Sequence, residues 1–265
     1  MQLQIRHTTQ YDYDQPVDYA LQKVRLHPLS SAMQDVTQWS VTVQGGKVEA
    51  GYVDHYGNHT DLVSIEPGGQ SLTITSQGVV TTLNSTGVFG AGYGRAPLWH
   101  FAQPTAATRA GPGIRALADV IGKSDTALNG LHTLSDAILS AAPYEVGATH
   151  TETTAEEALN GGKAVCQDHA QIFVSAARVC GIPARYVSGY LMMNDRVDQD
   201  ASHAWAEAHV DGLGWVGFDV SNGVSPDERY VRIAVGRDAR DASPIEGLRM
   251  GPSDETMIVS LQVQQ

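Results

Sequence analysis

The chain has 265 residues, 42% of them hydrophobic and 17% charged, which is an ordinary globular composition that allows one large domain or two smaller ones. Its net charge of −12 repels phosphate groups, so nucleic acid and anionic membrane surfaces are not expected partners. The first residues lack the basic start and apolar run of a secretory signal, and no stretch approaches the length of a membrane span, so we expect a soluble, cytoplasmic protein.

The first 85 residues are predicted to form a β-rich domain. Short runs such as WSVTV and SLTIT alternate polar and apolar side chains, are rich in Val and Thr, and are separated by turns such as Pro-Gly-Gly. This pattern indicates an antiparallel sheet or a small sandwich. Glycine and other small residues then dominate residues 84–99, so we expect a linker over residues 86–110.

Helical spacing begins after residue 110. Apolar residues recur every three or four positions over 113–122 and 126–142, and a shorter helix is predicted over 153–161, where threonine precedes two glutamates. A fourth helix is predicted from Cys166 to Cys180, ended by Gly181 and Pro183. Strands then return, so we expect an α+β fold with residues 111–265 as a second domain.

Cys166 lies in the first turn of the fourth predicted helix. The unpaired amides and the positive end of the helix dipole at that position favour a thiolate over a thiol, and the thiolate is the nucleophilic form. The same amides can donate hydrogen bonds to an oxyanion, and the backbone N–H of Cys166 is the first candidate donor. This position makes Cys166 a candidate nucleophile.

Cys180 is the only other cysteine in the sequence. Roughly 14 residues of helix would separate the two cysteines by about 21 Å, whereas a disulfide requires Cα atoms within about 7 Å. We therefore predict two free thiols, with Cys180 as a buried apolar residue near the end of the helix. The same separation excludes a closed zinc site made of Cys166, His169, Cys180 and His203.

His203 and Asp219 are the candidate partners of this thiol. The stretch HAWAEAHV alternates, with His203 on one face and small residues on the other, and a tight turn leads into GWVGFDV, which carries Asp219. A hairpin centred near Gly212 would place Asp219 opposite His203 and bring the imidazole and the carboxylate together. Cys166, His203 and Asp219 are thus predicted to form a Cys-His-Asp triad.

Other polar residues near the thiol are predicted to be structural. Asp168 is expected to complement the helix dipole rather than take part in the chemistry. His169 lies on roughly the same face as Cys166, but a base on a separate strand can present one nitrogen to the thiolate and the other to a carboxylate, so His203 is preferred. Packing or scaffold roles are predicted for Trp205, Trp215, Tyr144 and Arg185.

Three stretches resemble the bacterial transglutaminase-like cysteine proteases, a branch of the papain-like enzymes with a β-rich N-terminal region. They are IRHTTQYDYDQPVDYALQKVRLHPL, GGKAVCQDHAQIFVSAARVCGIPARYVSGYL and SHAWAEAHVDGLGWVGFDVSNG. The resemblance covers most of the chain and is weakest from about 85 to 130 and after 225. Two residues depart from the family pattern, because Ala164 stands where the family usually has Gly, and Val220 where it has Pro.

The resemblance implies a papain-like transglutaminase core as the catalytic domain over residues 111–265, preceded by an all-β N-terminal domain. It also implies acyl transfer, in which Cys166 attacks a peptide or glutamine carboxamide carbonyl, His203 protonates the leaving amine and Asp219 orients the imidazole. Water as second substrate would make the protein a protease or amidase, and an amine would make it a transglutaminase.

The expected partner is a peptide or protein substrate, and we expect no cofactor and no metal. Two alternatives stay open. In the first, the chain is a catalytically silent transglutaminase-like binding module. In the second, it is a Cys/His zinc hydrolase with an open site.

Overall fold

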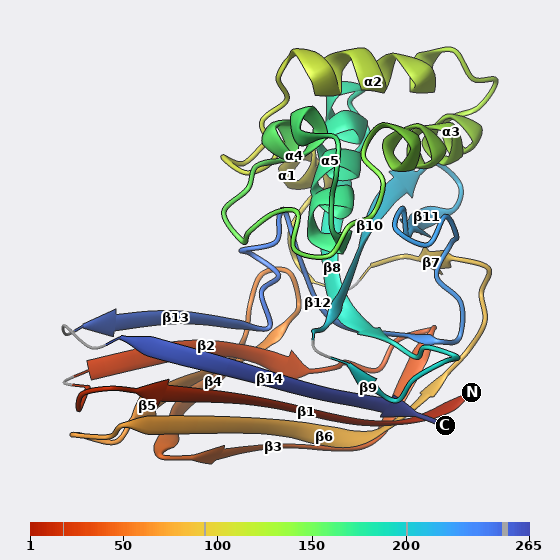
Figure 1. Cartoon of the computed structure of the whole chain (residues 1–265). Coiled ribbons are helices and arrows are strands. Elements are labelled where there is room, and N and C mark those ends of the chain that lie inside the picture. The colour runs from red at the N-terminus through yellow and green to blue at the C-terminus, as the bar shows by residue number, and fades with distance from the viewer. Residues whose placement is uncertain (18, 93, 200, 251–253) are drawn as a thin grey trace.

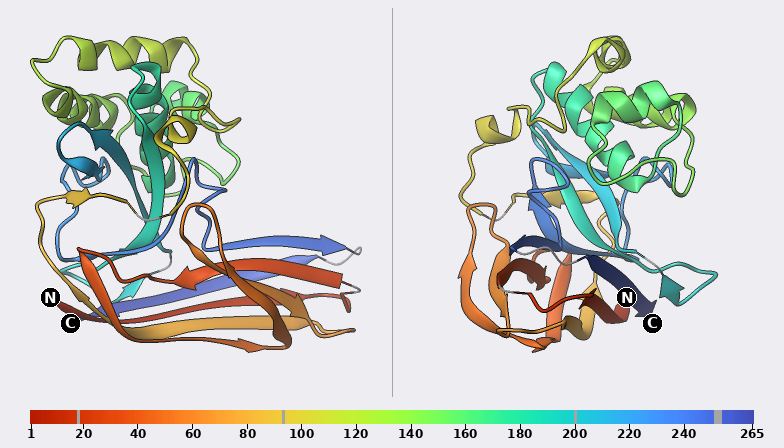
Figure 2. Two further views of the ribbon diagram at one scale, coloured as in Figure 1. Left: turned by 180° about the vertical axis from the view of Figure 1, so that it is seen from behind. Right: turned by 60° about the vertical axis from the view of Figure 1, so that its left-hand side comes forward.

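The computed structural model describes residues 1–265 apart from residues 18, 93, 200 and 251–253 (Figure 1). Helices gather at one end of the molecule, long strands lie at the other, and a third set of strands runs between them. Figure 2 shows the same division from two further sides. The α+β class predicted from the sequence is confirmed. No helix formed by the described residues has the length and apolar character that a membrane crossing requires.

Two antiparallel sheets form a sandwich at the strand-rich end. Inward-facing residues of both sheets, such as Tyr11, Val24 and Ile74, share one buried core, while alternate residues face outward. The sheets have the strand orders β3-β6-β1-β14-β9 and β13-β2-β5-β4. Their strands are β1 (Gln2–Tyr13), β2 (Tyr19–His27), β3 (Gln34–Gln44), β4 (Gly46–Val53), β5 (His59–Ile65), β6 (Ser71–Thr82), β9 (Asp198–Gln199), β13 (Ile245–Met250) and β14 (Glu255–Gln264).

The last two strands of the chain lie in this sandwich. Along its length β14 pairs with β1, from Gln4 opposite Gln264 to Tyr13 opposite Glu255, and β13 pairs with β2. The sequence analysis assigned both strands to the domain of residues 111–265, whereas in the structure they pair with β1 and β2, which lie within the first 85 residues. Their amphipathic pattern does not reveal which sheet edge they join, because either sheet offers unpaired backbone groups to a strand.

A third sheet and five helices make up the rest of the fold. The sheet has the order β12-β8-β10-β11-β7. Its strands are β7 (Val88–Gly90), β8 (Ala184–Leu191), β10 (His203–Val210), β11 (Gly214–Phe218) and β12 (Tyr230–Gly236). The helices are α1 (Leu98–Phe101), α2 (Pro112–Gly122), α3 (Ala127–Ala141), α4 (Ala155–Gly161) and α5 (Cys166–Val179). The predicted linker of residues 86–110 thus contains β7, which pairs with β11, and the one-turn helix α1.

Helix α5 is the centre of the helical layer. Its residues Ile172, Phe173 and Ala176 are fully buried against the other helices and against one face of β10. That face consists of small side chains, including Ala204 and Ala206, which let the helix approach the strand closely. The third sheet meets the sandwich through a separate apolar cluster that includes Ile5 of β1 and Tyr190 of β8.

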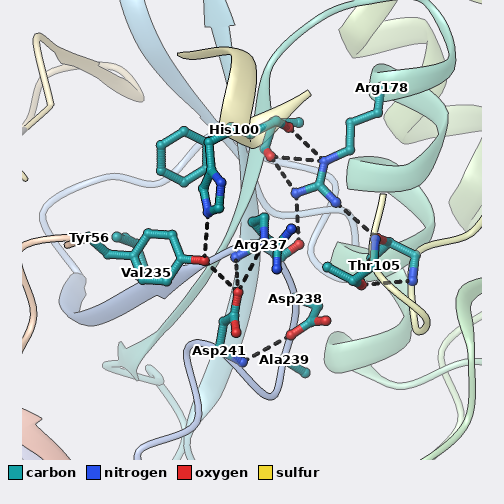
Figure 3. Close-up of polar contacts among 12 residues, drawn as sticks. Tyr56, His100, Thr105, Arg178, Val235, Arg237, Asp238, Ala239 and Asp241 are labelled. Carbon is teal, nitrogen blue, oxygen red and sulfur yellow. Dashed lines mark hydrogen bonds and ion pairs between the residues drawn. The ribbon is translucent and has the colours of Figure 1, made fainter. Parts of the chain in front are cut away.

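Polar contacts also fasten the helical half to the sandwich (Figure 3). The hydroxyl of Tyr56, in the turn between β4 and β5, donates to Asp241 at 2.5 Å and lies 3.2 Å from Nε2 of His100. Nearby, the guanidinium of Arg178 on α5 donates to the carbonyl oxygens of Phe101, Ala184 and Arg237. Burial lowers the pKa of Arg178 to about 10, so the group is still a cation at neutral pH. These contacts fix the loop after β12 against the end of α5.

Candidate active site

The nucleophile candidate stands at the first position of α5. Helix α4 is capped by Gly162, whose positive φ of 70° suits a residue without a side chain, and the extended Val165 then turns the chain into α5. Cys166 follows as a free, partly buried thiol. As predicted, it sits where the amides of the first helical turn have no partners within the helix.

Asp168 fixes the start of this helix. Its Oδ2 accepts hydrogen bonds from the backbone N–H of Val165 at 2.9 Å and from the hydroxyl of Thr149 at 2.6 Å, and the carboxylate is fully buried. The group therefore binds the turn before α5 and the loop after α3, which agrees with the structural role expected for it. The first intrahelical bond runs from the N–H of His169 to the carbonyl oxygen of Val165, so the N–H of Cys166 is among the amides that precede it.

His203 and Asp219 lie together beside Cys166. Nε2 of His203 is 2.6 Å from Oδ2 of Asp219, and the imidazole also forms a hydrogen bond with the thiol group of Cys166. Since Nε2 is used by the carboxylate, the sulfur bond falls to Nδ1. The structure therefore brings the three predicted residues into one hydrogen-bonded chain.

The hairpin that delivers His203 and Asp219 has a different register from the predicted one. Ala206 lies opposite Phe218 and Ala208 opposite Val216, so the ladder is displaced by two residues. A two-residue displacement keeps every side chain on its original face, because the side-chain period of a strand is two. Asp219 lies just past the end of β11, where it bridges to Val224 and turns back toward His203.

Asp219 has more partners than the sequence indicated. Its Oδ2 also accepts from the hydroxyl of Tyr230 and from Nδ2 of Asn222, both at 2.7 Å, and Oδ1 accepts from the Asn222 backbone. Burial alone would raise the pKa of this carboxyl, but the hydrogen bonds and the charge of His203 outweigh it and lower the pKa below its usual value. Asp219 is therefore an ionised, rigidly held acceptor at neutral pH.

The pKa of His203 is shifted in the opposite direction to that of Asp219. Burial alone would lower the pKa of His203, but the hydrogen bonds to Asp219 and Cys166, with the charges of both groups, raise it to about 10. The imidazole is then protonated at neutral pH. Because an imidazolium offers two N–H donors and no acceptor, the sulfur of Cys166 is the acceptor in its bond with His203.

His169 is not part of this chain of contacts. Its Nδ1 lies 2.8 Å from the hydroxyl of Ser221, and its Nε2 lies 2.7 Å from the carbonyl oxygen of Ala142. Burial lowers the pKa of His169, so it is neutral and donates from Nε2 while it accepts at Nδ1. Both nitrogens are engaged away from Cys166, and the preference for His203 over His169 agrees with this geometry. A zinc ion ligated by His169 would have to displace one of these two partners.

Cys180 differs from its prediction in one respect. The residue lies directly after α5 and is exposed, not buried, while its thiol donates to the carbonyl of Ala118. Helix α5 ends at Val179, which is itself exposed, and Cys180 follows on the same solvent-facing end. Burial of the sulfur and the nearby charge of Asp119 nevertheless raise the pKa of the Cys180 thiol.

A cavity of about 460 Å³ opens beside Cys166 and His203. Tyr144 stands at its rim with about half of its surface exposed, and Arg196 and Met193 line another side. Burial and the negative charges of Cys166 and Asp219 raise the pKa of the Tyr144 phenol, so its O–H remains a donor next to the site. Tyr144 was expected to be scaffold, and its proximity to the thiol is not visible in its sequence context.

The two departures from the family pattern are accommodated by the backbone. Ala164 is fully buried, forms a parallel bridge with Tyr144, and has a negative φ, so no glycine is needed there. Val220 is buried in the core that surrounds α5.

The predicted packing residues Trp205, Trp215 and Arg185 are all buried in the third sheet, and Nε of Arg185 donates to Glu207 at 2.7 Å.

Comparisons with known proteins agree with this fold. Residues 115–220 match the transglutaminase-like superfamily, and residues 3–81 match the bacterial transglutaminase-like N-terminal region. The chain therefore carries a transglutaminase-like superfamily core, preceded by the N-terminal region of bacterial transglutaminase-like proteins.

Among individual proteins, the chain is 28% identical to the uncharacterized protein ML0607 of Mycobacterium leprae, with 98% of both chains covered. It is 27% identical to the uncharacterized protein Rv2569c of Mycobacterium tuberculosis, with 98% of this chain and 91% of the relative covered. The crystal structure of "a putative cysteine protease from Cytophaga hutchinsonii" matches the fold with a TM-score of 0.78 at 22% identity, covering 100% of this chain and 91% of that one.

Proposed function

We propose that the protein is a cysteine-dependent acyl-transfer enzyme that acts on peptide or glutamine carboxamide carbonyls through a thioester on Cys166. The observation that carries this proposal is the position of His203, which bonds Asp219 through one nitrogen and Cys166 through the other. A protonated imidazole in that position both stabilises the thiolate and holds the proton that the leaving amine needs.

The reaction divides into two steps. In the first, the Cys166 thiolate attacks the carbonyl carbon, a C–S bond forms, and the C–N bond breaks as His203 transfers its proton to the departing amine. In the second, water or an amine attacks the thioester while the neutral His203 accepts its proton, and the thiolate leaves again. The backbone N–H of Cys166, at the positive end of α5, would stabilise the oxyanion in both steps.

Asp219 contributes by orientation. It holds the imidazole by Nε2, and it is itself held by Tyr230 and Asn222. A fixed ring keeps Nδ1 directed at sulfur, which a freely rotating histidine would not do. The cavity of about 460 Å³ is large enough for a peptide side chain and the adjoining backbone.

A peptide library that contains glutamine, incubated with and without a primary amine, tests the proposal. Mass spectrometry distinguishes chain cleavage, side-chain deamidation and amine incorporation. We expect at least one of these products from the wild-type chain and from Cys180→Ser, and none from Cys166→Ser. Products of equal yield in Cys166→Ser would contradict a reaction that depends on this cysteine, and an absence of products from every protein despite intact folds would favour the binding-module alternative.

A further inference from the structure

A second cluster of ionisable side chains lies in the sandwich, outside the cavity that contains Cys166. His27 is the last residue of β2 and lies directly opposite His59, the first residue of β5, in the antiparallel ladder. Asp61 follows two positions later on β5, so its side chain leaves the strand on the same face as that of His59. The three side chains therefore converge because of strand register, and they do so at one end of the sheet.

The spacing of their donor atoms suits a single metal ion. Nε2 of His27 is 2.9 Å from Oδ2 of Asp61, and Nε2 of His59 is 3.0 Å from Oδ1 of the same carboxylate. The three ligand atoms all lie within 4.8 Å of one another. Zinc binds imidazole nitrogen and carboxylate oxygen at about 2.0 to 2.2 Å, so neighbouring ligand atoms on one ion are about 3 Å apart.

The strand beside this cluster leaves room for an ion. Gly51 of β4 lies opposite Asp61 in the ladder. A Cβ at this position would approach Oδ1 of Asp61 to 2.9 Å and Nε2 of His59 to 3.6 Å. The glycine thus keeps the space in front of the ligand atoms clear of side chains from β4.

Solvent reaches the cluster from one side. The side chains of His27 and His59 are 27% and 34% exposed, whereas that of Asp61 is 10% exposed. An ion could enter from solvent and would keep water in its remaining coordination positions.

We propose that His27, His59 and Asp61 form a binding site for one divalent transition-metal ion of the zinc class. Two imidazoles and one carboxylate are ligands that zinc, nickel and copper share, whereas calcium and magnesium prefer oxygen alone. Such an ion would connect β2 to β5 at the end of their ladder, next to the register irregularity between Val24 and His27. The site does not depend on the proposed thiol chemistry. The competing explanation is a carboxylate that merely bridges two imidazoles by hydrogen bonds.

Zinc titration of the full chain tests the proposal, in a Cys166→Ser background that removes the nucleophilic thiol as a competing ligand. After treatment with a chelator, isothermal titration calorimetry with Zn²⁺ should give one ion per chain, and Co²⁺ should give a visible d–d absorption band. Each of His27→Ala, His59→Ala and Asp61→Asn should weaken Zn²⁺ binding by about tenfold or more. Zinc should also raise the melting temperature of the parent chain, and this shift should be lost in the variants.

Two further variants serve as matched controls. His55→Ala removes an exposed histidine four residues before His59 that is outside the cluster, and it should bind Zn²⁺ like the parent chain. Gly51→Ala keeps all three ligands but adds the crowding Cβ, and it should weaken binding as well. Circular dichroism confirms the fold of every variant. Unchanged stoichiometry and affinity in all three ligand variants, or no Zn²⁺ binding by the parent chain up to about 1 mM, would overturn the proposal.

Discussion

The hydroxyl of Tyr230 donates to Oδ2 of Asp219 at 2.7 Å, the same oxygen that lies 2.6 Å from Nε2 of His203. Tyr230 is the first residue of β12, while Asp219 follows β11 and His203 begins β10. Three strand ends thus meet at one carboxylate oxygen. The orientation of the histidine depends on a tyrosine that lies 27 positions further along the chain.

Replacement of Tyr230 by Phe is expected to slow the chemistry of Cys166 without unfolding the protein. The substitution keeps the ring in its apolar environment but removes one of the donors that fix Asp219. If the lost hydrogen bond reduces the stabilisation of the transition state by about 1 kcal/mol, the rate of acyl transfer falls about fivefold. The alkylation rate of Cys166 and the yield of peptide products measure this effect.

Tyr190→Phe is the matched control for this variant. Tyr190 is also a buried tyrosine of the third sheet, but its hydroxyl bonds Nδ1 of His7 in the sandwich. We expect it to leave the Cys166 rate unchanged. Equal slowing by both substitutions would mean that Tyr230 acts only through general stability.

Iodoacetamide at neutral pH should alkylate Cys166 at least about tenfold faster than Cys180. Cys166 is hydrogen-bonded to a protonated imidazole, whereas the pKa of the Cys180 thiol is raised by burial and by Asp119. The contrast is informative because Cys180 is the more exposed of the two residues. Peptide mapping after timed quenching gives both rates in one sample.

His203→Ala should abolish this preference, because sulfur then loses its donor. Cys180→Ser provides the reference rate for Cys166 alone. If the two cysteines of the wild-type chain react at similar slow rates, an activated thiolate at Cys166 is contradicted.

His169→Ala is expected to weaken the fold and to leave the reactivity of Cys166 largely intact. His169 connects the carbonyl of Ala142 to the hydroxyl of Ser221, and its removal leaves a buried carbonyl without its donor. The free energy of unfolding should fall by about 1 to 3 kcal/mol, measured by urea denaturation. A loss of Cys166 alkylation as large as that of His203→Ala, in a folded protein, would instead assign the base to His169.

The pH dependence of His203 provides a direct test of the site electrostatics. A histidine with its pKa raised to about 10 stays protonated well above pH 6.5 and loses its proton only as the pH rises through about 10. NMR titration of the imidazole carbon-bound protons should show this transition. Removal of either negative partner, by Asp219→Asn or Cys166→Ser, should lower the pKa of His203 by about one unit or more. A wild-type midpoint near 6.5 would contradict the charged arrangement.

The sequence contained enough information to predict much of the site. A cysteine after a glycine pair, at the start of an amphipathic helix, and the hairpin with His203 and Asp219 are local patterns, and the structure brings these residues together. The error of two residues in the hairpin register had no effect on this meeting, since it preserved the face of each side chain.

Features that depend on distant segments could not be predicted in the same way. Tyr144 and Tyr230 reach the site through a loop and a strand whose own sequences carry no chemical motif. The edges that β13 and β14 join, and the meeting of His27 with His59 and Asp61, are set by pairing between strands far apart in the chain. The local periodicity of a sequence contains no information about such pairings.

The pairing of β1 with β14 has a mechanical consequence. Gln4 lies opposite Gln264, so both chain ends leave the sandwich at the same end of one antiparallel ladder. Tension applied between the two termini would therefore act across the backbone bonds of that ladder one pair at a time, as in unzipping, instead of loading them all together in shear. Under such a force β14 would peel away first, and the half that contains the cysteine would stay folded until the peeling reached the connection after β12.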